Sequence, residues 1–179
     1  MSALVWFRRD LRLADNPAWA AATAEHDEVA ALFILDRRLL SSAGDLRRNL
    51  LFANLHALDE QLRQLGGGLT VETGDPVLIV PAIASHHDAV YWNRDYTPFS
   101  QRRDVAVAAG IGPGIETYDG NVVHAPEAVL TGRGTPYRFF TPYFRTWRST
   151  AVEPLPRAGP VSYTHLRAHE TDPTLSYAD

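Results

Sequence analysis

Short apolar runs recur between residues 3 and 118 and are separated by longer, more polar stretches. Runs of this length are typical of strands that are buried on both faces of a parallel sheet. We expect strands over residues 3–7, 29–35, 69–72, 89–92 and 115–118.

Helical patterns lie between the expected strands. Asn16 and Pro17 predict the start of a helix that continues through residues 18–25, with Asn as the N-cap and Pro at the first helical position. The clearest helix is expected over residues 47–65, where leucines three or four positions apart form one apolar stripe: Leu51, Leu55, Leu58, Leu62 and Leu65. Further helices are expected over residues 77–86 and 102–109, and residues 36–45 are expected to be a connection.

Strands and helices therefore alternate, with short connections between them. This alternation favours parallel strands that are joined by right-handed helical crossovers. We predict an α/β fold: a doubly wound, Rossmann-like sheet of five parallel strands, followed by a linker.

The chain changes character after Tyr118, where Gly, Pro, Thr and aromatic residues become frequent. We expect an α/β domain over residues 1–130 and an interdomain linker over residues 131–160 that packs against a later part of the protein. Back-translated, residues 161–171 match a transposon-end adapter used in shotgun DNA sequencing. We therefore expect residues 161–179 to be a non-native tail and the genuine sequence to end near Pro160.

Composition excludes several kinds of site. The 179 residues include no cysteine, which excludes disulfides, thiolate catalysis and cysteine-based zinc sites. All 17 basic residues are arginine, so a Schiff base or a Walker-type phosphate-binding lysine is also excluded. The net charge of -4 argues against a domain that binds DNA on its own, because binding requires a positively charged surface to neutralise the phosphates.

No apolar run is long enough to span a bilayer and no signal peptide is evident, so we expect a cytoplasmic protein without a membrane partner. No metal site is expected, because His165 and His169 lie in the suspect tail. We interpret His86 and His87 as a surface feature at a helix end. The glycines of residues 110–114 precede a strand, so they predict a turn and not a dinucleotide-binding loop. The nucleophile elbow of a hydrolase is absent.

Polar side chains directly follow three of the expected strands: Arg8 and Arg9, then Asp36, then Asn93 and Asp95. In an open parallel sheet, ligands bind beyond the carboxyl ends of the strands, where the strand order reverses. An Asp or Asn could bind the edge of a planar ligand there, with Trp6, Phe7 or Trp92 packed against its face. Alternatively, the arginines form ordinary ion pairs with Asp10 and Asp15 inside a loop.

Five segments of the sequence carry a more specific signal, and they occur in one order over nearly all of residues 3–147. They are LVWFRRDLRLADNPA (4–18), FILD (33–36), GDP (74–76), VYWNRDYTPFSQRRD (90–104) and GTPYRFFTPYFRTW (134–147). Together they resemble the successive signatures of the photolyase/cryptochrome family.

This resemblance implies a fold and a function. The family's first domain is a doubly wound α/β sheet that holds an antenna chromophore, usually a reduced folate or a deazaflavin. A long linker leads to an all-helical domain that binds FAD and damaged DNA. Excitation energy passes from the antenna to the reduced flavin, which donates an electron to a flipped-out cyclobutane pyrimidine dimer and splits it.

The resemblance also implies which residues bind the antenna chromophore: residues 6–9, Asp36, Arg47 and Asp95. Asp95 and Arg47 match positions that contact deazaflavin in family members that use it. Folate users tend to carry an Asn-Glu pair where this sequence has Phe99 and Ser100. A deazaflavin is therefore favoured over a folate.

We expect an N-terminal fragment of a deoxyribodipyrimidine photo-lyase that is inactive alone, because nothing after Trp147 matches the family's flavin-binding segments. The intact protein is expected to be a monomer that contacts damaged DNA through the helical domain. The alternatives are a fragment of a cryptochrome-type blue-light photoreceptor and a stand-alone nucleotide- or chromophore-binding module. The aromatic linker disfavours the stand-alone module, which would have no use for it.

Overall fold

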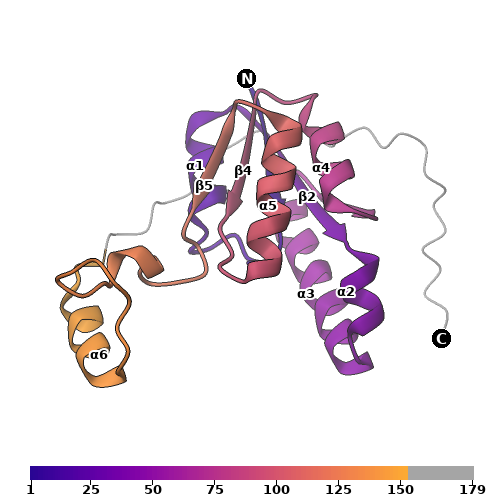
Figure 1. Cartoon of the computed structure of the whole chain (residues 1–179). Coiled ribbons are helices and arrows are strands. Elements are labelled where there is room, and N and C mark those ends of the chain that lie inside the picture. Colours follow the sequence, from indigo (N-terminus) through magenta and orange to yellow (C-terminus); the bar gives the residue numbers. More distant parts are fainter. Residues whose placement is uncertain (153–179) are drawn as a thin grey trace.

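A computed structural model describes residues 1–152, in which five strands form one parallel sheet (Figure 1). The strands are β1 (Ser2–Phe7), β2 (Glu28–Leu35), β3 (Leu69–Thr73), β4 (Ala89–Asn93) and β5 (Ile115–Tyr118). Their spatial order is β3-β2-β1-β4-β5, so the order reverses between β1 and β4. The predicted five-stranded parallel α/β fold is confirmed.

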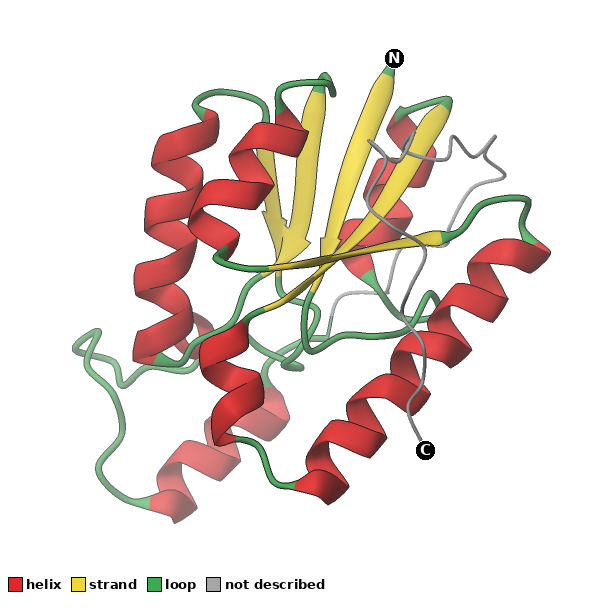
Figure 2. Cartoon of the chain, turned by 90° about the vertical axis from the view of Figure 1, so that its right-hand side faces the viewer, coloured by secondary structure: helices red, strands yellow, loops and turns green. Residues whose placement is uncertain are grey.

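Helices cover both faces of this sheet (Figure 2). The helices are α1 (Pro17–Glu25), α2 (Arg37–Ser42), α3 (Asp45–Gln64), α4 (Pro76–Ala84), α5 (Pro98–Ile111) and α6 (Phe140–Ser149), with one 3-10 turn, η1 (Pro126–Ala128). Helices α1 and α3 pack on one face, and α4 and α5 on the other. None of the helices among residues 1–152 is both long enough and apolar enough to cross a membrane.

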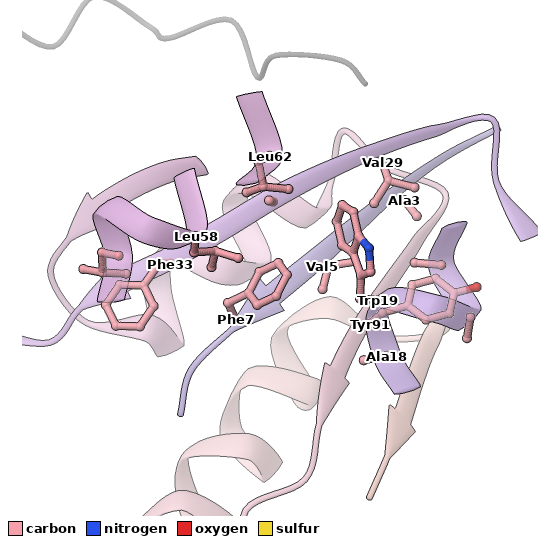
Figure 3. Packing of buried hydrophobic residues seen from close by; sticks show 14 of the residues in the cluster. Ala3, Val5, Phe7, Ala18, Trp19, Val29, Phe33, Leu58, Leu62 and Tyr91 are labelled. Atoms are coloured by element: carbon pink, nitrogen blue, oxygen red, sulfur yellow. The ribbon is translucent and has the colours of Figure 1, made fainter. Parts of the chain in front are cut away.

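Side chains of β1 alternate between the two faces, as a pleated strand requires. Phe7 packs toward α1 and α3, with its ring centroid 5.8 Å from that of Trp19, and Leu58 and Leu62 of α3 complete this layer (Figure 3). Trp6 points to the opposite layer, under α4 and α5. Burying a large apolar side chain contributes about 1.5–3 kcal/mol, so this two-sided core holds the strand ends in place.

Polar residues that follow the strands begin the next helices. The side chains of Asn16, Asp36, Asp75 and Thr97 accept hydrogen bonds from backbone N–H groups in the first turns of α1, α2, α4 and α5. Such N-caps satisfy donors that a helix start otherwise leaves unpaired. Four helices thus begin at the carboxyl edge of the sheet, which is where the candidate site was expected.

The structure differs from the expected elements in four respects. The expected connection over residues 36–45 contains α2, which Asp36 caps, and α5 begins at Pro98 instead of residue 102. Within the expected linker lies α6. The leucine stripe of α3 is buried at Leu55, Leu58 and Leu62 but not at its ends.

The domain boundary at residue 130 stays a prediction. Residues 153–179, with the end of the predicted linker and the predicted tail, lie outside the described residues.

Candidate functional site

The order of strands reverses between β1 and β4, and several charged side chains lie at the carboxyl end of this pair. We call the residues that follow β1, β2 and β4, together with the first turns of α5, the switch-point edge: residues 8–10, 36–38, 93–95 and 97–104. Open parallel sheets bind ligands at this point, because the crossovers on either side diverge from it.

Arg8 is buried at the switch-point edge, and its side chain is 6% exposed. Its Nη1 donates to both carboxylate oxygens of Asp104, at 2.5 and 2.6 Å, and its Nη2 donates to the carbonyl of Asn93. Burial lowers the pKa of Arg8, and the charge of Asp104 opposes this shift. Arg8 therefore ties the end of β1 to α5, and its ion-pair partner is not one of the loop aspartates.

Asn93 is fully buried in a hydrogen-bonded network with the start of α1. Its Nδ2 donates to the Oδ1 of Asn16 at 2.7 Å and also to the carboxylate of Asp10. Its Oδ1 accepts from the backbone N–H of Ala18 at 3.2 Å. Because these bonds use both amide hydrogens and the oxygen, Asn93 joins β4 to α1 and does not face a ligand.

Asp95 lies at the surface of the switch-point edge, and its side chain is 10% exposed. Burial raises the pKa of Asp95, but hydrogen bonds from the Thr97 N–H and the Ser100 hydroxyl, with the charge of Arg9, outweigh it and hold the pKa below its ordinary value. The Nη1 of Arg9 lies 3.5 Å from Oδ2 of Asp95, and the Arg9 side chain is 68% exposed. This pair places a carboxylate that is ionised at neutral pH beside an exposed guanidinium at the edge.

Asp36 begins α2 and pairs with Arg38. The Nη2 of Arg38 lies 2.7 Å from Oδ2 of Asp36 and 3.2 Å from Oδ1 of Asp75. The hydrogen bond from Arg38 holds the pKa of Asp36 below its ordinary value, although burial opposes this. The Arg38 guanidinium also lies over the ring of Phe99, with its Cζ 5.8 Å from the ring centroid. Arg38 thus connects the starts of α2, α4 and α5.

Arg103 joins these groups across the edge. Its Nη2 lies 2.9 Å from Asp104, and its Cζ lies 5.0 Å from the ring centroid of Trp6. The charge of Arg103 also helps to lower the pKa of Asp36. Arg8 and Arg103 therefore share the carboxylate of Asp104.

The structure brings Arg8 to Asn93 and Arg9 to Asp95, and Asp36 pairs with Arg38 at the same edge of the sheet. Trp6 and Phe7 belong to opposite core layers, and Trp92 contacts Trp6 edge to face in one of them. Arg47 is exposed near the start of α3. The aromatic residues named from the sequence are thus core residues, and Arg47 lies on α3, outside the switch-point edge.

Sequence reasoning missed the ion pair of Arg103 and Asp104 at this edge. Both residues lie on α5, whose start the sequence analysis placed at residue 102 instead of Pro98. Thr97 is an N-cap residue, and Pro98 is the residue type favoured at the first helical position. This pair in the sequence indicates that the helix begins at residue 98. Placing the helix start there would have aligned Phe99 and Arg103 on one face at i, i+4 spacing.

Comparisons with known proteins identify the family of this chain. Residues 3–161 match the DNA photolyase family. A deoxyribodipyrimidine photo-lyase from Synechococcus sp. is 35% identical over 171 residues, which cover 91% of this chain and 35% of that protein. The chain thus spans about a third of the length of the photolyases it matches.

Solved structures share the fold. A photolyase from Sulfolobus tokodaii, described with two FAD molecules and a novel light-harvesting cofactor, matches with a TM-score of 0.78 and 28% identity over 92% of this chain and 38% of its own. A cryptochrome from Synechocystis sp. matches with a TM-score of 0.78 over 87% of this chain and 36% of its own, and its 24% identity supports the fold alone. On the family match over nearly its whole length, this chain belongs to the DNA photolyase family.

Proposed function

We propose that this chain is the chromophore-binding α/β part of a deoxyribodipyrimidine photo-lyase, which repairs cyclobutane pyrimidine dimers in DNA with light. One observation carries the proposal: in a chain of this family, exposed arginine side chains, each paired with a largely buried aspartate, gather at the strand-order reversal. Arg9 offers a guanidinium group there beside the ionised carboxylate of Asp95, and Arg38 is paired with the ionised carboxylate of Asp36.

The photolyases that this chain matches are about three times as long as the matched part. We assign FAD and damaged DNA to a helical part that the matched third does not include. The chain alone is accordingly proposed to be inactive in repair. The intact protein is proposed to be a cytoplasmic monomer.

The chemistry of the edge suits a flat, polar pigment. Ring heteroatoms and hydroxyl groups need donors and acceptors at the pigment's rim, and an aromatic surface is needed for its face. Arg9 supplies donors and Asp95 supplies an acceptor. Phe99 is a partly exposed ring, and the hydroxyl of the next residue, Ser100, donates to Asp95. When bound, the pigment absorbs near-ultraviolet or blue light and transfers excitation energy to the flavin.

We propose that Asp95 and Arg9 orient the rim of this pigment and that Arg47 contributes a second guanidinium. Asp95 stays ionised at neutral pH because hydrogen bonds and Arg9 hold its pKa low against the opposing effect of burial. A deazaflavin is favoured over a reduced folate, since Phe99 and Ser100 stand where folate-using members tend to carry Asn and Glu.

Chromophore retention tests this proposal. We expect the purified chain to retain a deazaflavin through gel filtration, with a red-shifted absorption band, and Asp95→Ala to weaken this retention. Asp45→Ala is the matched control, because Asp45 is an exposed aspartate in the first turn of α3.

The outcomes separate the parts of the proposal. Retention of a methenyl-folate instead of the deazaflavin would contradict the choice of chromophore but not the site. Retention of neither compound would remove the antenna assignment. Equal retention by the wild type and by folded Asp95→Ala would remove the role of Asp95.

A further inference from the structure

The aromatic residues at the carboxyl ends of β1 and β4 and at the start of α5 differ sharply in exposure. Trp6, Phe7 and Trp92 are buried in the two core layers. Phe99, in the first turn of α5, is 37% exposed. Among these four rings at the carboxyl end of the sheet, Phe99 is the one with a face that a ligand could reach.

The ring of Phe99 is held on a rigid part of the fold. Thr97 caps α5, and its Oγ1 accepts from the Ser100 N–H at 3.3 Å, while Pro98 occupies the first turn. The hydroxyl of Ser100 donates to Oδ2 of Asp95 at 2.9 Å. The position of Phe99 is therefore coupled to that of Asp95, the proposed rim contact.

A flat cation covers this ring in the structure. The Cζ of Arg38 lies 5.8 Å from the centroid of Phe99, and the Arg38 side chain is 54% exposed. A guanidinium group is planar and stacks on aromatic faces, so it occupies the place that a planar ligand would take. Arg38 is also tethered to Asp36 and Asp75, and these ion pairs do not depend on its contact with the ring.

We propose that Phe99 is the ring on which the antenna chromophore stacks and that Arg38 covers this ring until the chromophore binds. This inference rests on the proposed function. It assigns to Phe99 the contact with the flat face of the chromophore, which the buried rings of Trp6, Phe7 and Trp92 cannot make. The chromophore displaces the Arg38 guanidinium from the ring, while Asp36 and Asp75 keep the arginine beside the site. Phe99 thus selects flat aromatic ligands, and Arg38 sets how tightly they bind.

Fluorescence titration with a deazaflavin tests this inference. Stacking a ring on an aromatic side chain is worth enough that its removal is expected to raise Kd about 5- to 150-fold in Phe99→Ala. Phe99→Leu keeps an apolar side chain but lacks a ring face, so we expect it to bind weakly as well. Phe99→Tyr should bind like the wild type. Phe52→Ala, which removes an exposed ring from α3, is the control and should leave Kd unchanged.

Arg38→Met keeps the length of the side chain and removes the guanidinium. Because the guanidinium no longer competes for the ring of Phe99, the variant should bind the deazaflavin about 2- to 5-fold more tightly. This change in Kd corresponds to the free energy of an exposed cation–π contact. Weaker binding by Arg38→Met would overturn the covering role and make Arg38 a ligand contact.

The results distinguish this inference from the proposed function. If the wild type binds no deazaflavin and no methenyl-folate, the proposed function fails. If the wild type binds a chromophore but folded Phe99→Ala and Phe99→Leu bind it equally well, only the role of Phe99 fails. Circular dichroism of each variant shows whether it is folded, and Phe99→Leu keeps the test valid if Phe99→Ala does not fold.

Discussion

Arg8 and Arg9 are adjacent in the sequence but have opposite surroundings. The Arg8 side chain is 6% exposed, and its Nη1 and Nη2 donate to Asp104 and Asn93, whereas the Arg9 side chain is 68% exposed. Removing one partner of a buried pair typically costs about 3–5 kcal/mol, while an exposed pair contributes about 0–1 kcal/mol. Arg8 therefore stabilises the fold, and Arg9 remains available for a ligand.

His87, at the other end of the sheet, is a second residue whose surroundings differ from those expected from the sequence. We interpreted it as a surface residue, but both of its ring nitrogens are buried without a hydrogen-bond partner, and it lines a cavity of about 180 Å³ with Pro81, Gly110 and Pro113. Burial lowers the pKa of His87, and the neighbouring His86 lowers it further. The neutral imidazole is accordingly the form that the folded chain favours.

This lowered pKa predicts a pH dependence of stability. Because the unfolded state binds a proton more readily, the free energy of unfolding should fall as the pH drops below about 6.5, and the loss should end near the lower, folded-state pKa. His87→Gln should flatten the curve in this window, as measured by urea denaturation between pH 5 and 8. His56→Gln is the control, because His56 is exposed on α3 beside Glu60. An unchanged slope in His87→Gln would show that His87 does not titrate in this way.

At the scale of elements, the loop after β5 packs closely against the end of β4. A side-chain Cβ at Gly120 would overlap the amide group of Asn93. Asn93 cannot move aside easily, because Asp10, Asn16 and Ala18 hold it. The Arg12 side chain also donates to the Gly120 carbonyl at 2.7 Å, which fixes the loop over the start of α1.

Gly120→Ala should therefore destabilise the chain by about 1–3 kcal/mol, the usual cost of overpacking a filled interior. Thermal or urea unfolding measures this. Gly132→Ala is matched in chemistry, but nothing lies within 4 Å of the added carbon, so little change is expected. Similar stabilities for the two variants would mean that the loop yields to the added methyl group.

At the scale of the whole molecule, α6 lies apart from the helical layers of the sheet (Figure 1). Its aromatic residues recur at helical spacing and form a stacked row: the centroids of Phe140 and Phe144 are 5.6 Å apart, and those of Phe144 and Trp147 are 6.2 Å apart. No residue of α6 is buried. Contiguous exposed apolar surface of this kind marks an interaction site or promotes aggregation.

The exposed row predicts that the chain self-associates in solution. Phe140→Ser combined with Phe144→Ser should lower the apparent mass in light scattering at a given protein concentration, because the association buries these rings. Val105→Ser, which removes an isolated exposed apolar residue from α5, should have no effect. A monomeric wild type at high concentration would contradict this prediction.

Local sequence determined the elements and the class of fold. Apolar runs flanked by N-caps, such as Asn16 before α1, locate strands and helix starts because these depend on neighbouring residues. The hydrophobic pattern is a weaker indicator where a helix has no buried face. Helices α2 and α6 bury no residue, and neither helix was expected from the sequence. The spacing of Phe140, Tyr143, Phe144 and Trp147 was a helical signal that went unused.

Only the tertiary structure decided which residues at the strand ends are buried in contacts within the fold and which remain exposed. Arg8 and Asp104 are 96 positions apart, and they meet because α5 crosses back over the end of β1. The same crossing leaves Phe99 and Arg9 exposed, while Asn93 is enclosed by the start of α1. Sequence periodicity reports which way a side chain points from its own strand or helix, but exposure depends on what other elements place against it.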